Sequence, residues 1–116
     1  MRIKVRNVTR DRILGDGVRE ATSLFSRMKG LLGMRSLSPG EGLWLCPCHS
    51  IHSMGMDFEF DALFLDAGMR VVALYRRFRR NRISRIYWDA RGVLELPGGT
   101  IERTGTEVGD EIEFRA

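Results

Sequence analysis

The sequence predicts an α+β fold: a mostly antiparallel, curled sheet of short strands, with one main helix in the N-terminal half of the chain. Short apolar runs separated by turn-forming residues recur along most of the chain, which is typical of strands. With 13 glycines and 3 prolines, the composition also favours many turns. A length of 116 residues fits one domain, which we place over residues 1–116.

The N-terminal part predicts two strands and then the helix. Ile3 and Val5 alternate with charged residues, as in a half-exposed strand. A second strand is expected to begin at Ile13 and to end at the glycines of residues 15–17. From Val18 to Leu32, apolar residues recur at three- and four-residue spacing, which predicts an amphipathic helix.

The remaining chain predicts further short strands joined by turns. The expected strands are Leu43–Leu45, Phe58–Leu65, Val71–Tyr75, Val93–Leu96 and Ile112–Phe114. Asp66-Ala67-Gly68 predicts a hairpin turn. Residues 97–100 predict another turn, and residues 105–110 a polar loop.

The stretch that begins at Cys46 contains both cysteines and both histidines. Cys48 and His52 share one face if the segment is extended, and Asp61 follows at the start of a buried strand. A thiol, an imidazole and a carboxylate could act as nucleophile, base and orienting group. With Cys46 and His49 they could instead bind a metal. Equally, Cys48 could be a small buried residue and His52 could bond to a backbone group or carboxylate.

Five residues are candidates for ligand binding: Cys48, His52, Met56, Asp61 and Glu95. We expect Cys48, His52 and Asp61 to lie in one cluster. A sheltered aspartate needs a donor, and His52 is the nearest candidate in sequence. Met56 is a soft metal ligand or a flexible core residue. Glu95 alternates with two leucines, so the favoured interpretation is that it faces solvent.

Six arginines lie within ten positions and are candidates for anion binding: Arg76, Arg77, Arg79, Arg80, Arg82 and Arg85. Together these arginines carry a charge of +6. The net charge of the chain is +4, so the remaining residues carry 4 − 6 = −2. Arginines with aromatic neighbours are typical of nucleic-acid or anionic surfaces. We rank a solvated loop above a nucleic-acid partner, because no recognisable nucleic-acid-binding motif accompanies the arginines.

Hydropathy and cysteine content bear on location. No run approaches the ~18 apolar residues of a membrane span, and no apolar leader begins the chain. Only two cysteines occur, two positions apart. These features predict a cytoplasmic protein with reduced thiols.

Several segments together resemble the domain of unknown function 192 (DUF192) family, above all the signature Pro47-Cys48-x-Ser50-Ile51-His52. The other similar segments are Arg27–Gly33, Gly40–Leu45, Met56–Asp66, Leu94–Gly99 and Val108–Asp110. The chain departs from the family at Glu59, where a proline is usual, and over residues 76–88. The resemblance implies a β-rich, barrel-like domain and assigns no reaction.

We therefore expect a small cytoplasmic binding or accessory domain, with a pocket around Cys48, His52 and Asp61 for a small molecule or protein partner. Two alternatives remain open. One is a metal-binding protein or thiol-dependent enzyme that uses the same residues. The other is an anion or nucleic-acid binder that acts through Arg76–Arg85. The residues assign no cofactor, reaction or oligomeric state.

Overall fold

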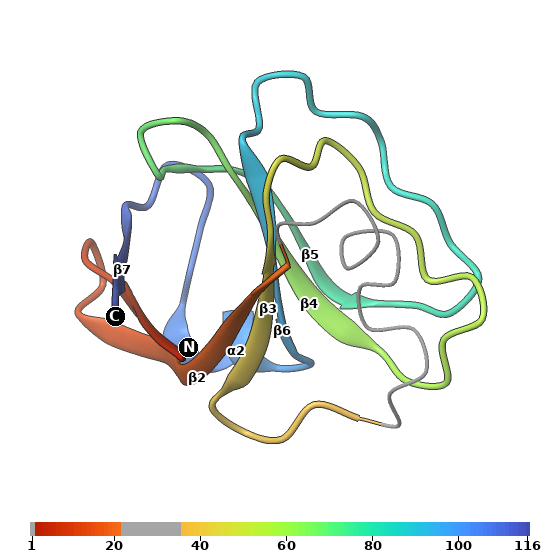
Figure 1. The fold of residues 1–116 in the computed structure, drawn as a ribbon, viewed down its shortest axis with the longest axis horizontal. Coiled ribbons are helices and arrows are strands. Elements are labelled where there is room, and N and C mark those ends of the chain that lie inside the picture. Colours follow the sequence, from red (N-terminus) through yellow and green to blue (C-terminus); the bar gives the residue numbers. More distant parts are fainter. Residues whose placement is uncertain (1, 22–35) are drawn as a thin grey trace.

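The computed structural model describes residues 2–21 and 36–116, and the account below concerns these residues. They form a curled sheet of seven strands in the order β5-β4-β6-β3-β2-β1-β7 (Figure 1). The elements are β1 (Ile3–Asn7), β2 (Arg12–Ala21), β3 (Glu41–Leu45), β4 (Phe60–Leu65), β5 (Val71–Phe78), β6 (Gly92–Pro97), α2 (Thr100–Thr104) and β7 (Ile112–Arg115).

The two outer strands meet at one corner, so the sheet curls toward closure. An isolated bridge joins Arg70, before β5, to Glu111, before β7. Next to it, Val71 N–H donates to the carbonyl of Asp110 over 2.9 Å. Neighbouring strands run antiparallel except for β2 and β3, which are parallel. The barrel-like, mostly antiparallel sheet is therefore confirmed.

Both faces of the sheet are covered by apolar clusters, and β4 contributes to each. Its alternating residues Leu63 and Leu65 join the cluster on the side of α2. Phe60, Ala62 and Phe64 join the second cluster, on the opposite side. Every residue of β4 is buried, as the apolar pattern of this strand predicts.

The predicted N-terminal strands and the later strands all occur, with ends shifted by a few residues. The predicted hairpin between β4 and β5 is also confirmed. Its first residue, Asp66, accepts the backbone N–H groups of Gly68 and Arg70 on Oδ1, over 2.9 and 3.0 Å. The last strand, β7, lies at the edge of the sheet, as expected.

The start of the predicted helix is wrong. Residues 18–21 continue β2, which pairs with β3 from Gly17 to Ala21. The glycine turn does not end the strand, because the chain packs closely there: a Cβ on Gly15 would lie 2.8 Å from the carbonyl oxygen of Gly40. The rest of the predicted helix, residues 22–32, lies outside the described residues.

The single helix of the described residues, α2, lies in the C-terminal half, between the predicted turn at residues 97–100 and the predicted polar loop at residues 105–110, where no helix was expected. It begins at Thr100, after Gly99 at φ 95°. Its N-terminal end has no side-chain cap from its own segment.

No helix within residues 2–21 and 36–116 is long and apolar enough to cross a bilayer.

Candidate functional site

The central stretch forms loop 46–59, which runs beside loop 79–91 (Figure 1). Backbone hydrogen bonds join the two: Ser53 N–H to Arg82 O over 2.9 Å, Ser84 N–H to Ile51 O over 2.9 Å, and Tyr87 N–H to His49 O over 2.8 Å. Loop 46–59 begins with a cis Cys46–Pro47 peptide bond. We call these two segments the paired loops.

Asp61 is fully buried and accepts three backbone N–H groups. These come from Arg77 at 2.8 Å, Gly99 at 3.2 Å and Ile101 at 2.7 Å. The carboxylate therefore caps the start of α2 from another strand and also holds the β5 backbone. It belongs to the framework of the fold.

The predicted pairing of His52 with Asp61 is wrong. The His52 side chain is exposed, and its Nδ1 accepts the N–H of Met54 over 3.3 Å. His52 therefore forms a hydrogen bond with a nearby backbone group, which was the alternative interpretation. The physical reason is that three backbone donors, more precisely placed than a loop histidine, already surround the Asp61 carboxylate.

Cys48 and Met56 both pack on the second apolar cluster. Asp61 belongs to the other face, because it alternates with Ala62, which is part of that second cluster. The sheet therefore separates Asp61 from Cys48 and Met56. The Cys48 thiol donates to the carbonyl of Ser50 over 3.0 Å, whereas Cys46 packs on the first cluster.

Glu95 lies on the same face as Ala62, its direct neighbour on β4. Its neighbour on β3 is Leu43, and both flanking residues are apolar. Only 4% of Glu95 is exposed, so the solvent-facing interpretation is wrong. The reason is that β6 is an inner strand covered on both faces, which the local pattern does not reveal.

The Glu95 carboxyl is unusual in its hydrogen bonding and in its pKa. Its Oε1 has no hydrogen-bond partner within the described part of the chain. Burial raises the pKa of Glu95 to about 8. Near neutral pH the group is therefore mostly protonated and can both donate and accept a hydrogen bond.

All six arginines of the predicted anion-binding segment are exposed. Arg77 differs from the others because its Nε pairs with Glu102 at 3.3 Å. The segment is anchored by Tyr75 and Tyr87, whose hydroxyls lie 2.7 Å apart. Burial and this hydrogen bond raise the pKa of Tyr87 to about 12.

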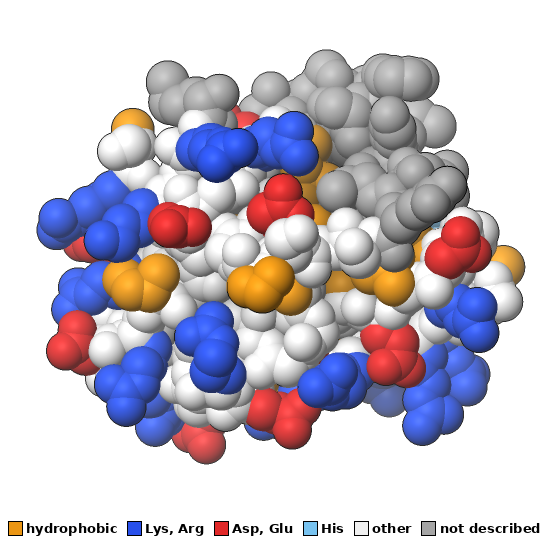
Figure 2. All heavy atoms as spheres, turned by 90° about the horizontal axis from the view of Figure 1, so that it is seen from below, with side chains coloured by type: hydrophobic (Ala, Val, Ile, Leu, Met, Phe, Trp, Pro, Cys, Tyr) orange, Lys and Arg blue, Asp and Glu red, His pale blue; other side chains and the backbone are white. Residues whose placement is uncertain are grey.

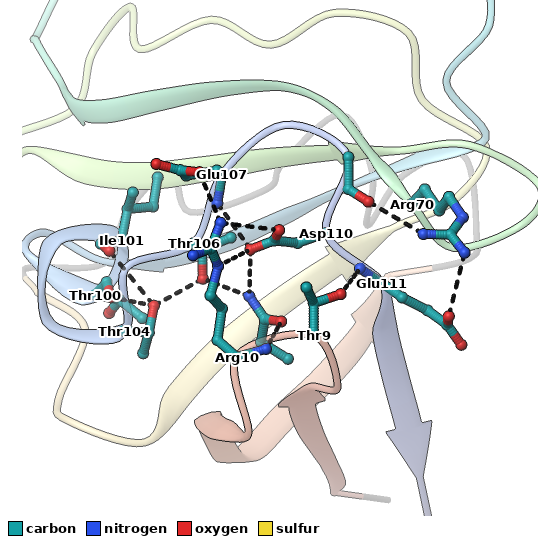
Figure 3. Close-up of polar contacts among 12 residues, drawn as sticks. Thr9, Arg10, Arg70, Thr100, Ile101, Thr104, Thr106, Glu107, Asp110 and Glu111 are labelled. Atoms are coloured by element: carbon teal, nitrogen blue, oxygen red, sulfur yellow. Dashed lines mark hydrogen bonds and ion pairs between the residues drawn. The ribbon is translucent and has the colours of Figure 1, made fainter.

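A further buried acid, Asp110, ends a segment that resembles the DUF192 family but was not among the candidate site residues. Its Oδ2 accepts Arg10 Nε at 2.9 Å (Figure 3). The same oxygen accepts Asn7 Nδ2 at 3.0 Å. Burial acts to raise the pKa of Asp110, but the hydrogen bonds from Arg10 and Asn7 outweigh it, and the pKa lies below its ordinary value. The partners are about 100 residues apart, so no local signal could reveal them.

Metal binding receives no geometric support from these residues. Within residues 2–21 and 36–116, no three histidine, cysteine or acidic side chains come together as a metal site. Charges elsewhere are mixed: on the face shown in Figure 2, basic and acidic side chains lie beside one another.

A profile of the DUF192 family, described as an uncharacterized ACR, matches residues 7–114. The chain belongs to the DUF192 family. A UPF0127 protein from Thermococcus sibiricus is 30% identical over 119 residues, which cover 93% of the DUF192 chain and 72% of the relative. The family carries no assigned biochemical role.

Two crystal structures are similar to this DUF192 fold. A protein of unknown function from Novosphingobium aromaticivorans superposes with a TM-score of 0.82 at 20% identity, covering 96% of this chain and 82% of that one. A candidate transcription regulator from Sinorhizobium meliloti gives a TM-score of 0.79 at 21% identity, covering 97% and 91%. At these identities the likeness concerns the fold alone.

Proposed function

We propose that this DUF192 chain is a small, single-domain binding protein of the cytoplasm whose ligand is recognised by the carboxyl of Glu95. The observation that carries the proposal is that Oε1 of Glu95, in a side chain only 4% exposed, has no hydrogen-bond partner among residues 2–21 and 36–116. A buried polar group without a partner costs roughly 1–3 kcal/mol. A bound ligand that completes the hydrogen bonding would offset that cost.

The surroundings of Glu95 define the class of ligand. Leu43 and Ala62 flank the carboxyl, and Val93 precedes it on the same face. A protonated carboxyl in such surroundings pairs best with an uncharged group that offers one donor and one acceptor, such as a primary amide. An apolar body beside that group would fit the side chains of the second cluster.

Binding is favoured over thiol catalysis. The Cys48 thiol donates to a backbone carbonyl, and His52 Nδ1 accepts a backbone N–H. These bonds direct the two side chains to backbone groups and do not join them as nucleophile and base. Strongly shifted pKa values are typical of functional sites, and burial raises the pKa of Glu95 to about 8.

The test uses benzamide as a simple amide probe and ethylbenzene, which lacks the polar group, as its control. Backbone NMR shifts of residues 43 and 92–97 report binding. We expect benzamide to bind at about pH 6 and at least about tenfold more weakly at about pH 10, where Glu95 is ionised.

Variants make the test specific. Glu95→Leu should lose benzamide binding, whereas Glu95→Gln should retain it without the pH dependence, because glutamine resembles the protonated acid. The control Glu20→Leu changes an exposed acid on β2 and should bind like the parent chain. Equal benzamide binding by Glu95→Leu and the parent chain at both pH values would contradict the proposal.

A further inference from the structure

The paired loops form an ordered platform at the end of the molecule away from β7 (Figure 1). Besides the bonds between the loops, Ile51 N–H donates to the hydroxyl of Ser84 over 2.9 Å. Tyr87 packs on Phe64 of β4 with ring centroids 4.6 Å apart. Side chains on the outer side of these loops are therefore held by the sheet beneath.

This platform exposes large apolar side chains. Trp88 is 76% exposed, Ile83 is 74% exposed and Ile86 is 55% exposed. Met54, from the other loop, is also exposed. They account for four of the six exposed large apolar side chains in the described residues. A gathering of this kind on a water-facing surface is typical of an interaction site.

The same platform carries a net positive charge: the paired loops contain five arginines and three acids, Asp57, Glu59 and Asp89, so their charge is 5 − 3 = +2. Within the described residues, no ion pair involves Arg79, Arg80, Arg82 or Arg85 of the paired loops, or Arg76 of the adjoining strand β5. Outside the platform, Arg6, Arg10 and Arg70 pair with an acid, whereas Arg2, Arg12 and Arg19 have no ion pair within the described residues. The unpaired cations make the platform complementary to a surface of negative charge.

The apolar side chains distinguish between two kinds of negative partner. Single-stranded nucleic acid binds through aromatic platforms on which bases stack. Ile83 and Ile86 cannot stack, and Trp88 already lies against His49, with ring centroids 5.4 Å apart. Aliphatic side chains with tryptophan and arginine are the set that enters the interface of an anionic membrane.

We propose that the paired loops dock this protein on an anionic phospholipid surface. Trp88, Ile83 and Ile86 enter the headgroup region, and the unpaired arginines bind lipid phosphates. This surface is distinct from the Glu95 site, because Glu95 is buried in the sheet and the platform side chains are exposed.

The experiment measures binding to vesicles of phosphatidylcholine alone and of phosphatidylcholine with about one third phosphatidylglycerol. Trp88 is a natural probe, because the other tryptophan, Trp44, is buried. We expect a blue shift of tryptophan emission with the anionic vesicles, absent with the neutral ones and weakened by added salt. Trp88→Phe should abolish the blue shift, whereas Trp44→Phe should keep it.

Two sets of variants test the two components. Replacing Arg79, Arg80 and Arg82 by glutamine should weaken vesicle binding by about a hundredfold, since each basic residue near an anionic surface contributes about fivefold. The matched control removes the same charge from exposed Arg2, Lys4 and Arg12 and should weaken binding much less.

Ile83→Ser with Ile86→Ser should reduce binding about tenfold or more. Val108→Ser is the exposed apolar control.

Binding to neutral and anionic vesicles alike, or no vesicle binding, would overturn the proposal. So would tight binding to a single-stranded oligonucleotide that the isoleucine variants leave unchanged, because it would assign the arginines to nucleic acid. Circular dichroism and thermal unfolding of each variant establish that it is folded before binding is compared.

Discussion

Glu95 and Asp61 show how far single residues can be interpreted from a sequence. Each is an acid within an apolar strand, and Asp61 was expected to be sheltered because the strand after it is apolar on both faces. For Glu95 the same alternation favoured exposure, because a pattern within one strand does not show what covers it. Glu95 is buried because its strand, β6, lies between β3 and β4.

The raised pKa of Glu95 makes stability depend on pH. The folded protein retains the proton up to about pH 8, whereas the unfolded chain loses it near pH 4.5. The stability contribution of Glu95 is therefore complete below the unfolded value and is lost as pH rises through the folded value. We expect urea unfolding of the parent chain to show decreasing stability from about pH 5 to pH 8.

Glu95→Gln should remove most of that decrease, because the amide does not ionise in this range. The exposed acid Glu20 supplies the matched control: Glu20→Gln should leave the pH profile of the parent chain intact. An unchanged profile in Glu95→Gln would show that the Glu95 carboxyl does not carry the raised pKa.

Among the elements, α2 depends most plainly on a partner from elsewhere in the chain. The helix has five residues, too few to be stable alone, and the Asp61 carboxylate receives the N–H groups of Gly99 and Ile101. The same carboxylate receives the N–H of Arg77, which has a positive φ of 49° in β5. One acid thus joins β4, β5 and α2.

Asp61→Ala should lower the free energy of unfolding by about 2–4 kcal/mol, because three N–H groups, one buried and two partly buried, lose their acceptor. Urea unfolding measures the loss, and hydrogen exchange at residues 77, 99 and 101 should accelerate. Asp66→Ala is a matched control: it also removes an acceptor of two N–H groups, but at a solvent-exposed turn. Equal losses in the two variants would contradict a special role for Asp61.

The sequence predicted the strands well because their alternation and turn residues are local signals. It failed at β2 and α2, where the decisive contacts are distant. Val18 and Ala21 fit a helical pattern but are held in β2 by pairing with β3. For the site, Cys48 and Met56 pack on the second apolar cluster, whereas Asp61 lies on the other face of the sheet, so the expected cluster of Cys48, His52 and Asp61 does not form.

Across the whole molecule, the first and last strands hold the sheet together. β1 pairs with β7 from Lys4–Arg115 to Asn7–Ile112. Beside them, Asn7 and Arg10 bind Asp110 (Figure 3). Because the pKa of Asp110 is lowered, its contribution is present above the ordinary carboxyl value and is lost as pH falls through the folded value.

Asp110→Asn should therefore destabilise the protein by about 1–3 kcal/mol at neutral pH and make acid unfolding less steep. Unfolding midpoints between about pH 2 and pH 7 measure both effects. Asp11→Asn is the control, since Asp11 pairs with Arg6 on the surface, where ion pairs contribute little. Loss of the same size in Asp11→Asn would contradict the role given to Asp110.

The pairing of β1 with β7 has a consequence during protein synthesis. Of the strands of the sheet, β1 is synthesised first and its partner β7 last, so one edge of β1 has no partner until all the other strands have been made. An uncovered strand edge can pair with another polypeptide. A truncated product that ends before β7 would keep this edge open and be prone to aggregate.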